Sequence, residues 1–313
     1  MLRAFLLLIL LAAASVRAES LLQRPVDLPT ATGELHGTLL LPKRTPPLSV
    51  VLLIAGSGPT DRDGNNPAGR NDSLKRLAWA LAERGIASVR YDKRGVAASR
   101  DAAPDEQMLS VEGYVADAAA WGRKLKADPR FSRLVLIGHS EGALIATLAA
   151  EQAGADALVA IAGSGRPIDQ VLLEQLRSRL PPPLLAYSRA LVGDLKAGRT
   201  REDVPDPLQI LFRPSVQPYL ITLFRQDPAA AFARLRIPAL IVQGTRDIQV
   251  GVADAEALKR AKPDAELALI DGMNHVLRIV PADLQRQLAS YDEPDLPLAQ
   301  ELEQVVGDFV LRQ

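Results

Sequence analysis

Residues 134–142 read Leu-Val-Leu-Ile-Gly-His-Ser-Glu-Gly, an apolar run that leads directly into a Gly-x-Ser-x-Gly motif. The run predicts a buried strand, and residues 141–152 have the pattern of a helix. A strand that turns sharply into a helix at such a serine is the context of a nucleophile elbow. Small residues on both sides of Ser140 permit the turn, while the helix N-terminus and the backbone N–H of Glu141 favour a developing oxyanion. Ser140 is therefore predicted to be a nucleophile; the alternative is a serine that only caps the helix.

Apolar runs and helical patterns alternate along the rest of the chain. Strands are predicted at residues 26–41, interrupted at 32–33 to give a hairpin, and at 50–55, 86–91, 134–137, 157–162, 239–243 and 266–270. Helices are predicted at residues 73–84, 111–127 after Ser110, 141–152, 252–261 and 298–311. This alternation predicts an α/β fold with a mainly parallel central sheet and helices on both faces.

Residues 165–235 break the alternation. This stretch contains repeated prolines and short helical patterns, such as that at residues 169–179, but no convincing strand–helix pair. An insertion between two strands commonly sits over the carboxyl edge of the sheet, where such folds bind ligands. We interpret it as a helical cap insertion; the alternative is a surface excursion with only a structural role.

A serine nucleophile requires a base and an acid that orients it. The chain has three histidines. His139 adjoins the nucleophile and would have to fold back sharply to reach it, and His36 lies in the predicted hairpin. His275 follows the strand at 266–270, and Asp247 follows the strand at 239–243, so both are predicted at the same sheet edge as Ser140. Asp247 also lies between Ser140 and His275 in the chain, which is the order expected when the nucleophile stands on such an elbow. In the alternative, Asp247 caps a loop and His275 is a polar residue of a turn.

A second oxyanion donor is expected in the loop after the strand at residues 50–55. That loop begins Gly-Ser-Gly-Pro at residues 56–59, and the N–H of Ser57 is predicted to be the donor that acts with the N–H of Glu141. A phosphate-binding loop is the competing interpretation, but the lysine of a P-loop is missing and Pro59 removes a donor. Asp61 and Asp63 suggest calcium, yet the following residues do not complete an EF-hand loop.

The composition excludes several classes of chemistry. The chain of 313 residues has no cysteine, which rules out disulfides, thiolate zinc sites, iron–sulfur clusters and a cysteine nucleophile. Its 37 basic and 37 acidic residues give no electrostatic case for binding nucleic acid. No metal or organic cofactor is expected, because hydrolysis by a serine triad needs none.

The first residues have the pattern of an export signal. A basic start at residues 1–3 precedes an apolar run at 4–14, and small residues then lead to Ala18. We predict a signal peptide at 1–18 and a hydrolase domain at 19–313, in a soluble periplasmic or secreted protein with no stable membrane insertion after cleavage. An uncleaved N-terminal anchor is the alternative.

Several motifs together resemble the α/β-hydrolases, and more narrowly the bacterial esterase branch related to serine aminopeptidase-like hydrolases. They are residues 56–63 (Gly-Ser-Gly-Pro-Thr-Asp-Arg-Asp), 90–95 (Arg-Tyr-Asp-Lys-Arg-Gly), 138–142, 213–219 (Arg-Pro-Ser-Val-Gln-Pro-Tyr), 247–250 and 274–275. The resemblance implies hydrolysis of short-chain carboxylic esters of small molecules, with Ser140, Asp247 and His275 as the triad. It also implies that residues 213–219 help to form the acyl pocket. Ala55 departs from the many members of the superfamily that have histidine there.

Two other functions remain open at this stage. An exported peptidase of the same fold would need cap carboxylates to hold a substrate amine, and Glu174, Glu202 and Asp203 are present in the cap segment. A non-catalytic binding protein on a hydrolase scaffold is the second alternative. Substrate-binding residues and the oligomeric state are not assigned by the sequence.

Overall fold

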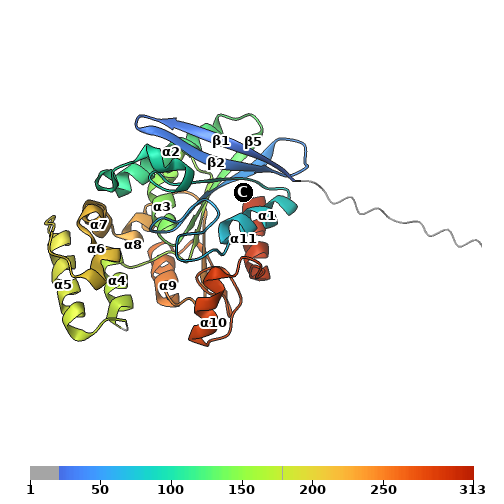
Figure 1. The fold of residues 1–313 in the computed structure, drawn as a ribbon. Helices are drawn as coiled ribbons and strands as arrows, with labels where there is room; N and C mark the ends of the chain where they lie inside the picture. Colours follow the sequence, from blue (N-terminus) through green and yellow to red (C-terminus); the bar gives the residue numbers. More distant parts are fainter. Residues whose placement is uncertain (1–20, 178) are drawn as a thin grey trace, which may run out of the picture.

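The structure is a computed structural model that describes residues 21–177 and 179–313, so the predicted signal peptide at 1–18 lies outside the described residues. An eight-stranded sheet in the order β1-β2-β4-β3-β5-β6-β7-β8 forms the centre of the molecule (Figure 1). The strands are β1 (Leu22–Thr30), β2 (Gly33–Leu41), β3 (Leu48–Ile54), β4 (Ala87–Tyr91), β5 (Phe131–His139), β6 (Ala157–Ile161), β7 (Ala239–Gly244) and β8 (Glu266–Ile270). The β1–β2 hairpin and the β2–β4 pair are antiparallel, and the remaining pairs are parallel.

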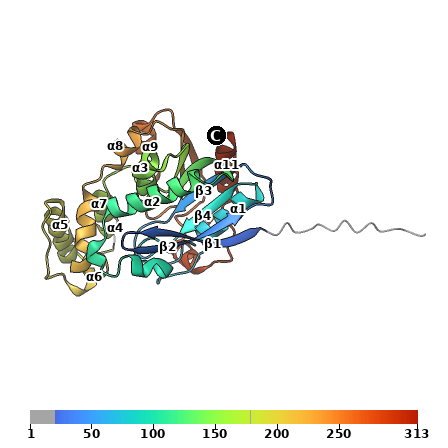
Figure 2. The same ribbon diagram turned by 90° about the horizontal axis from the view of Figure 1, so that it is seen from above.

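Helices cover both faces of the sheet (Figures 1 and 2). The helices α1 (Ser73–Glu83) and α11 (Gln300–Arg312) pack on one face, and α2 (Val111–Lys126), α3 (Glu141–Ala153) and α9 (Val252–Ala261) pack on the other. The predicted α/β architecture, a mainly parallel sheet between two helical layers, is confirmed.

The strand β3 shows why these short apolar runs form the centre of the sheet. Val50, Leu52 and Ile54 belong to one core cluster, whereas Val51 and Leu53 belong to the other. Successive side chains of a strand point to opposite faces, so a strand covered on both sides must be apolar at every position. The continuous run at residues 50–55 meets that requirement.

The observed bounds differ modestly from the predicted ones. The bounds of α9 and β8 are those predicted, while β5 extends from the predicted 134–137 to Phe131–His139. The helix α2 begins after Ser110, whose hydroxyl accepts a hydrogen bond from the N–H of Gly113 at 3.0 Å. The helix α10 (Leu284–Ala289) and the 3-10 segments Ala97–Ala102 and Glu106–Met108 were not predicted.

The described residues between β6 and β7 form no strand. They form α4 (Ile168–Arg177), α5 (Pro182–Lys196), α6 (Gln209–Phe212), α7 (Gln217–Phe224) and α8 (Pro228–Ala233), with 3-10 turns at Asp206–Leu208 and Pro214–Val216. Helix α5 packs on α4 and α7, and α8 packs back on α3 and α9. The helices α4 to α7 project as a separate group at one side of the sheet (Figure 1); we call residues 168–224 the helical lobe.

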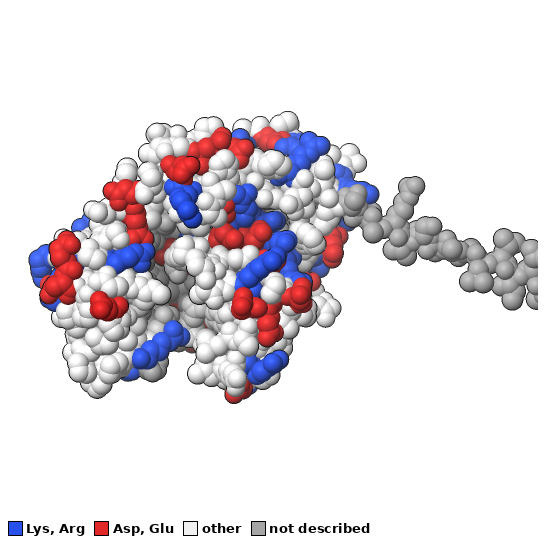
Figure 3. Space-filling view, in the orientation of Figure 1, with Lys and Arg blue, Asp and Glu red and all other residues white. Residues whose placement is uncertain are grey.

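The surface charge is mixed. On the face drawn in Figure 3, acidic and basic side chains lie interspersed, without a broad area of one sign. Among the described residues, no helix combines the length and the apolar character needed to cross a lipid bilayer.

Candidate active site

Ser140 lies at a strained turn between β5 and α3. Its φ of 56° and ψ of −123° belong to a region that residues with a side chain rarely adopt. The flanking glycines permit the turn, since a Cβ added to Gly138 would lie 2.1 Å from the carbonyl oxygen of Gly142, and one added to Gly142 would lie 2.2 Å from that of Ile54. The chain thus turns where β5, β3 and α3 approach one another closely, which is the geometry of a nucleophile elbow.

Asp247 and His275 lie on the loops that follow β7 and β8. The Nδ1 atom of His275 is 2.8 Å from Oδ2 of Asp247, and both side chains are buried. The other oxygen, Oδ1, accepts hydrogen bonds from the N–H groups of Gln249 at 2.8 Å and Val250 at 3.0 Å. Burial by itself raises the pKa of the Asp247 carboxyl, but the charge and hydrogen bond of His275, aided by these two N–H groups, lower it below its usual value. The carboxylate is therefore held ionised against the imidazole.

Backbone hydrogen bonds join the two loops that carry this pair. The N–H of Thr245 donates to the carbonyl of Ile270, and the N–H of Arg246 donates to that of Met273, both at 3.0 Å. A Cβ on Gly244 would lie 2.1 Å from the carbonyl oxygen of Met273, so glycine is needed for this approach. The loops are therefore fixed relative to each other, which sets the distance between Asp247 and His275.

His139 supports His275 from the elbow side. Its Nε2 atom is 2.8 Å from the backbone carbonyl oxygen of His275, and the two rings are 4.8 Å apart between centroids. Burial, together with the charge of His275, lowers the pKa of His139 to about 3. Neutral His139 therefore donates a hydrogen bond from Nε2 to this carbonyl. Because His139 directly precedes Ser140, the bond holds the His275 backbone next to the elbow. The sequence places His139 next to the elbow, but it gives no sign of this contact.

Ser140, Ser57 and Glu141 border one cavity of about 360 Å³. The backbone N–H groups of Ser57 and Glu141 donate to no residue that the structure describes. A Cβ added to Gly56, the residue before Ser57, would lie 3.2 Å from Cβ of Ser140. The loop therefore runs close to the nucleophile, with its N–H group available to a ligand.

The helical lobe supplies most of the apolar wall of this cavity. The wall includes Ile168, Val171, Leu172, Leu220, Leu223 and Phe224. Of the segment that the sequence associates with an acyl pocket, Arg213, Val216 and Tyr219 border the cavity. Arg213 is paired with Glu106, its Nε lying 2.8 Å from Oε2, and Ser215 donates to the same oxygen at 2.6 Å. Glu106, on a segment before α2, is a wall residue that sequence reasoning missed.

The carboxylates considered for an amine site lie elsewhere. Glu174 is exposed and pairs with Arg166 at 2.7 Å, and Glu202 and Asp203 are exposed in the lobe. None of the three borders the cavity.

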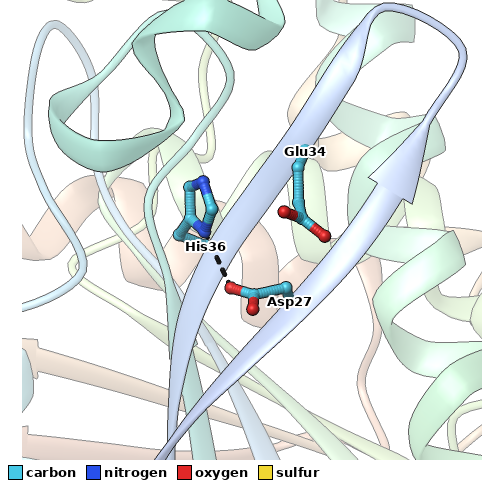
Figure 4. A group of neighbouring side chains, drawn as sticks. All are labelled: Asp27, Glu34 and His36. Carbon is cyan, nitrogen blue, oxygen red and sulfur yellow. Dashed lines mark hydrogen bonds and ion pairs between the residues drawn. The ribbon is translucent and has the colours of Figure 1, made fainter.

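His36 belongs to a different cluster. It lies with Asp27 and Glu34 on the β1–β2 hairpin (Figure 4), and its Nδ1 atom is 2.7 Å from Oδ1 of Asp27. Within the described part of the chain, this is the one group of three or more His, Asp or Glu side chains whose potential metal-ligand atoms all lie within 4.8 Å of one another. The cluster is largely exposed, and none of its residues borders the cavity.

Comparison of the sequence with known proteins finds a matching family and a similar esterase. The sequence profile of the serine aminopeptidase S33 family matches residues 69–279. The chain is 33% identical over 247 residues to esterase EstD of Thermotoga maritima, a match that covers 78% of this chain and 58% of EstD. The chain therefore spans less than two thirds of the length of this relative.

Solved structures share the fold. Est1E from Butyrivibrio proteoclasticus aligns with a TM-score of 0.59 at 17% identity, covering 92% of this chain and 98% of Est1E. The esterase domain of a Rhodothermus marinus protein aligns with a TM-score of 0.57 at 20% identity, covering 93% and 98% of the two chains.

Proposed function

Since the chain belongs to the serine aminopeptidase S33 family of α/β-hydrolases, we propose that it is a serine carboxylesterase that hydrolyses short-chain esters of small molecules. One arrangement carries the proposal: Ser140 stands on a strained elbow at an apolar cavity, and the buried Asp247–His275 pair is bonded to the elbow through His139. Similarity to an esterase supports the ester over other substrates of this fold.

The proposed first step is attack of the Ser140 hydroxyl on the ester carbonyl. The Asp247 carboxylate accepts a hydrogen bond from the N–H at Nδ1 of His275. This leaves Nε2 as the basic nitrogen that takes the Ser140 proton. The carboxylate then stabilises the imidazolium without taking the proton. His275 returns this proton to the leaving alcohol, and an acyl group remains on Ser140.

The second step is hydrolysis of the acyl-enzyme by water. His275 takes a proton from water, the resulting hydroxide attacks the acyl carbonyl, and His275 protonates Ser140 as the acid leaves. In both steps the negative oxygen is stabilised by the N–H groups of Ser57 and Glu141, which border the cavity with Ser140.

The lobe side of the cavity is proposed to take the acyl chain. Its wall is formed by apolar side chains such as Leu220, Leu223 and Phe224, which favour burial of methylene groups by about 0.8 kcal/mol each. Activity on p-nitrophenyl esters should therefore rise from acetate and then fall when the chain outgrows the cavity.

Loss of activity in Ser140→Ala tests the function as a whole. Purified wild-type protein should hydrolyse p-nitrophenyl butyrate and react with a fluorophosphonate at Ser140, and the variant should do neither. Ser132→Ala is a matched control, because Ser132 is exposed on the same strand, β5, outside the cavity wall. Unchanged hydrolysis by Ser140→Ala would refute the proposal, and a folded wild type that neither hydrolyses esters nor is labelled would favour a binding protein.

A peptidase of the same fold is the second candidate, because the matching family is named for serine aminopeptidases. Glu174, Glu202 and Asp203, the carboxylates considered for an amine, do not border the cavity, and the carboxylate of Glu106, which does, is bonded to Arg213 and Ser215. An aminoacyl p-nitroanilide should therefore be a much poorer substrate than a p-nitrophenyl ester; a preference for the anilide would favour the peptidase.

We also propose that residues 1–18 direct export and that the enzyme acts in the periplasm or outside the cell. Its proposed substrates are small-molecule esters, and no nucleic-acid partner is proposed. N-terminal sequencing of the protein from a periplasmic fraction should begin at Glu19. Recovery of the full chain from the cytoplasm would refute the export proposal and leave the catalytic one untouched.

A further inference from the structure

Lys93 is a buried lysine behind the loop that carries Ser57. Lys93 is only 2% exposed and lies two residues after the end of β4. Its Nζ atom donates hydrogen bonds to the carbonyl oxygen of Gly56 and, at 3.0 Å, to that of Gly58. The two accepting carbonyls belong to the residues on either side of Ser57, so one ammonium group holds both sides of the loop.

Such a position is unusual for a lysine, because burial of an ammonium group without a paired charge is unfavourable. No carboxylate of the described residues lies within ion-pair distance of Nζ. Burial lowers the pKa of Lys93, and the charge of Glu141 opposes this effect. The ring of Tyr114, 5.4 Å from Nζ at its centroid, adds a cation–π contact.

The hydrogen bond to Gly56 acts on the same peptide group that carries the N–H of Ser57. A peptide unit is planar and delocalised, so its carbonyl and its N–H respond together. A charged donor at the carbonyl oxygen makes a stronger hydrogen bond than a neutral one, and it polarises the unit so that its N–H becomes a better donor. The bond also fixes the plane of the peptide and hence the direction of the N–H.

We propose that Lys93 is a positioning residue for the oxyanion hole: by holding the Gly56 and Gly58 carbonyls, it orients and polarises the peptide N–H of Ser57 toward the oxyanion of the tetrahedral intermediate. This inference rests on the proposed function. Lys93 does not border the cavity, so it acts through the peptide and without touching the substrate.

Lys93→Met tests the inference, because methionine keeps an unbranched side chain but has neither the charge nor the N–H donors. The kcat for p-nitrophenyl butyrate should be measured per active site titrated with a fluorophosphonate, so that misfolded molecules do not count. We expect kcat to fall by about 10- to 100-fold, somewhat less than the loss of a whole oxyanion donor, and KM to change by less than about 3-fold. Lys93→Gln, which keeps a neutral donor, should lie between the wild type and Lys93→Met.

A second measurement separates this role from a structural one. An alkylboronic acid forms a tetrahedral adduct with a catalytic serine and places an oxygen in the oxyanion hole. Its Ki should rise with Lys93→Met by about the factor by which kcat falls. If Lys93 only stabilised the fold, the change in Ki would not match the change in kcat.

Lys262 provides the matched control. It is 6% exposed, and its Nζ donates to the backbone carbonyl of Leu235 at 3.1 Å and pairs with the exposed Asp264 at 2.8 Å, but it is outside the cavity wall. Lys262→Met removes the ammonium group of another lysine with a small exposed fraction that binds a backbone carbonyl, and it should leave kcat per titrated site and the boronate Ki unchanged.

The inference is overturned if Lys93→Met retains kcat per site and boronate Ki within about 2-fold of the wild type, or if KM alone changes. That result leaves the esterase proposal intact when hydrolysis still depends on Ser140. Absence of any hydrolysis or labelling in the wild type would instead refute the proposed function.

Discussion

Replacing Ser140 with glycine should make the protein more stable while it removes the proposed nucleophile. The turn holds Ser140 at φ 56° and ψ −123°, and only glycine adopts such backbone angles without steric conflict at Cβ. The native fold therefore stores strain at the residue that the proposed reaction uses.

The size of the gain follows from two opposing contributions. A residue with a side chain in such a region costs about 1–3 kcal/mol, which glycine would relieve. Glycine also gives the unfolded chain more freedom, which reduces the free energy of unfolding by about 0.4–1 kcal/mol. The expected net gain in the free energy of unfolding for Ser140→Gly is about 1 kcal/mol. In domains of about 150–250 residues this corresponds to a rise in Tm of about 2–4 °C, and the rise should be near the lower end of that range in this longer chain.

Ser140→Ala is the appropriate reference, because alanine lacks the hydroxyl but keeps the Cβ that causes the strain. Urea and thermal unfolding of the two variants should be compared by circular dichroism at the same pH. If Ser140→Gly is no more stable than Ser140→Ala, the strain argument fails, whatever the activities of the two proteins.

Three further predictions concern the groups around the elbow. Asp247→Asn should lower kcat by about 10⁴-fold, as in the analogous serine-protease substitution, because the amide favours the wrong imidazole tautomer; an unchanged kcat would assign the acid elsewhere. His275→Ala should abolish ester hydrolysis, whereas His36→Ala, on the exposed hairpin, should retain it; the reverse result would identify His36 as the base. The pKa of His139 is about 3 in the fold and 6.5 in its ordinary state. The unfolded chain therefore binds the proton first as pH falls, and the stability contributed by neutral His139 is present in full above about pH 6.5 and is lost toward pH 3, by up to about 1.4 kcal/mol per pH unit. Urea unfolding between pH 4 and 7 should show a shallower pH dependence for His139→Gln than for the wild type, and equal slopes would contradict the assignment.

The strands and the three proposed triad residues were predictable because their signals are local. A strand buried on both faces must be apolar throughout, as at residues 50–55, and a sharp turn between close backbones requires glycines, as at Gly138 and Gly142. Once the parallel strands are assigned, the residues that follow them share one edge of the sheet, which relates Asp247 and His275 to Ser140.

The helical lobe was predicted as a helical insertion with a helix near residues 169–179, where α4 lies, but the bounds of its other helices were not predicted. Two of its helices, α6 and α7, span only four and eight residues, and both α5 and α7 have proline in the first turn, so much of the lobe lacks an extended periodic pattern. Which carboxylates face the cavity depends on how these helices pack. Glu174 in α4 is turned to Arg166, while Glu106, from a distant segment, reaches the wall beside Arg213.

By itself, the sequence determined the α/β class, the elbow at Ser140 and the order of the proposed triad, because burial, turn sterics and motif order act through neighbouring residues. Only the tertiary structure decided which groups surround that elbow. Lys93, in the charged run at residues 92–94, has the sequence pattern of an exposed loop, yet it is buried because the carbonyls of Gly56 and Gly58 come from a loop on the neighbouring strand, β3. Hydrogen bonds between segments that are distant in the chain leave no periodic or spaced pattern in the sequence, so only the folded structure reveals them.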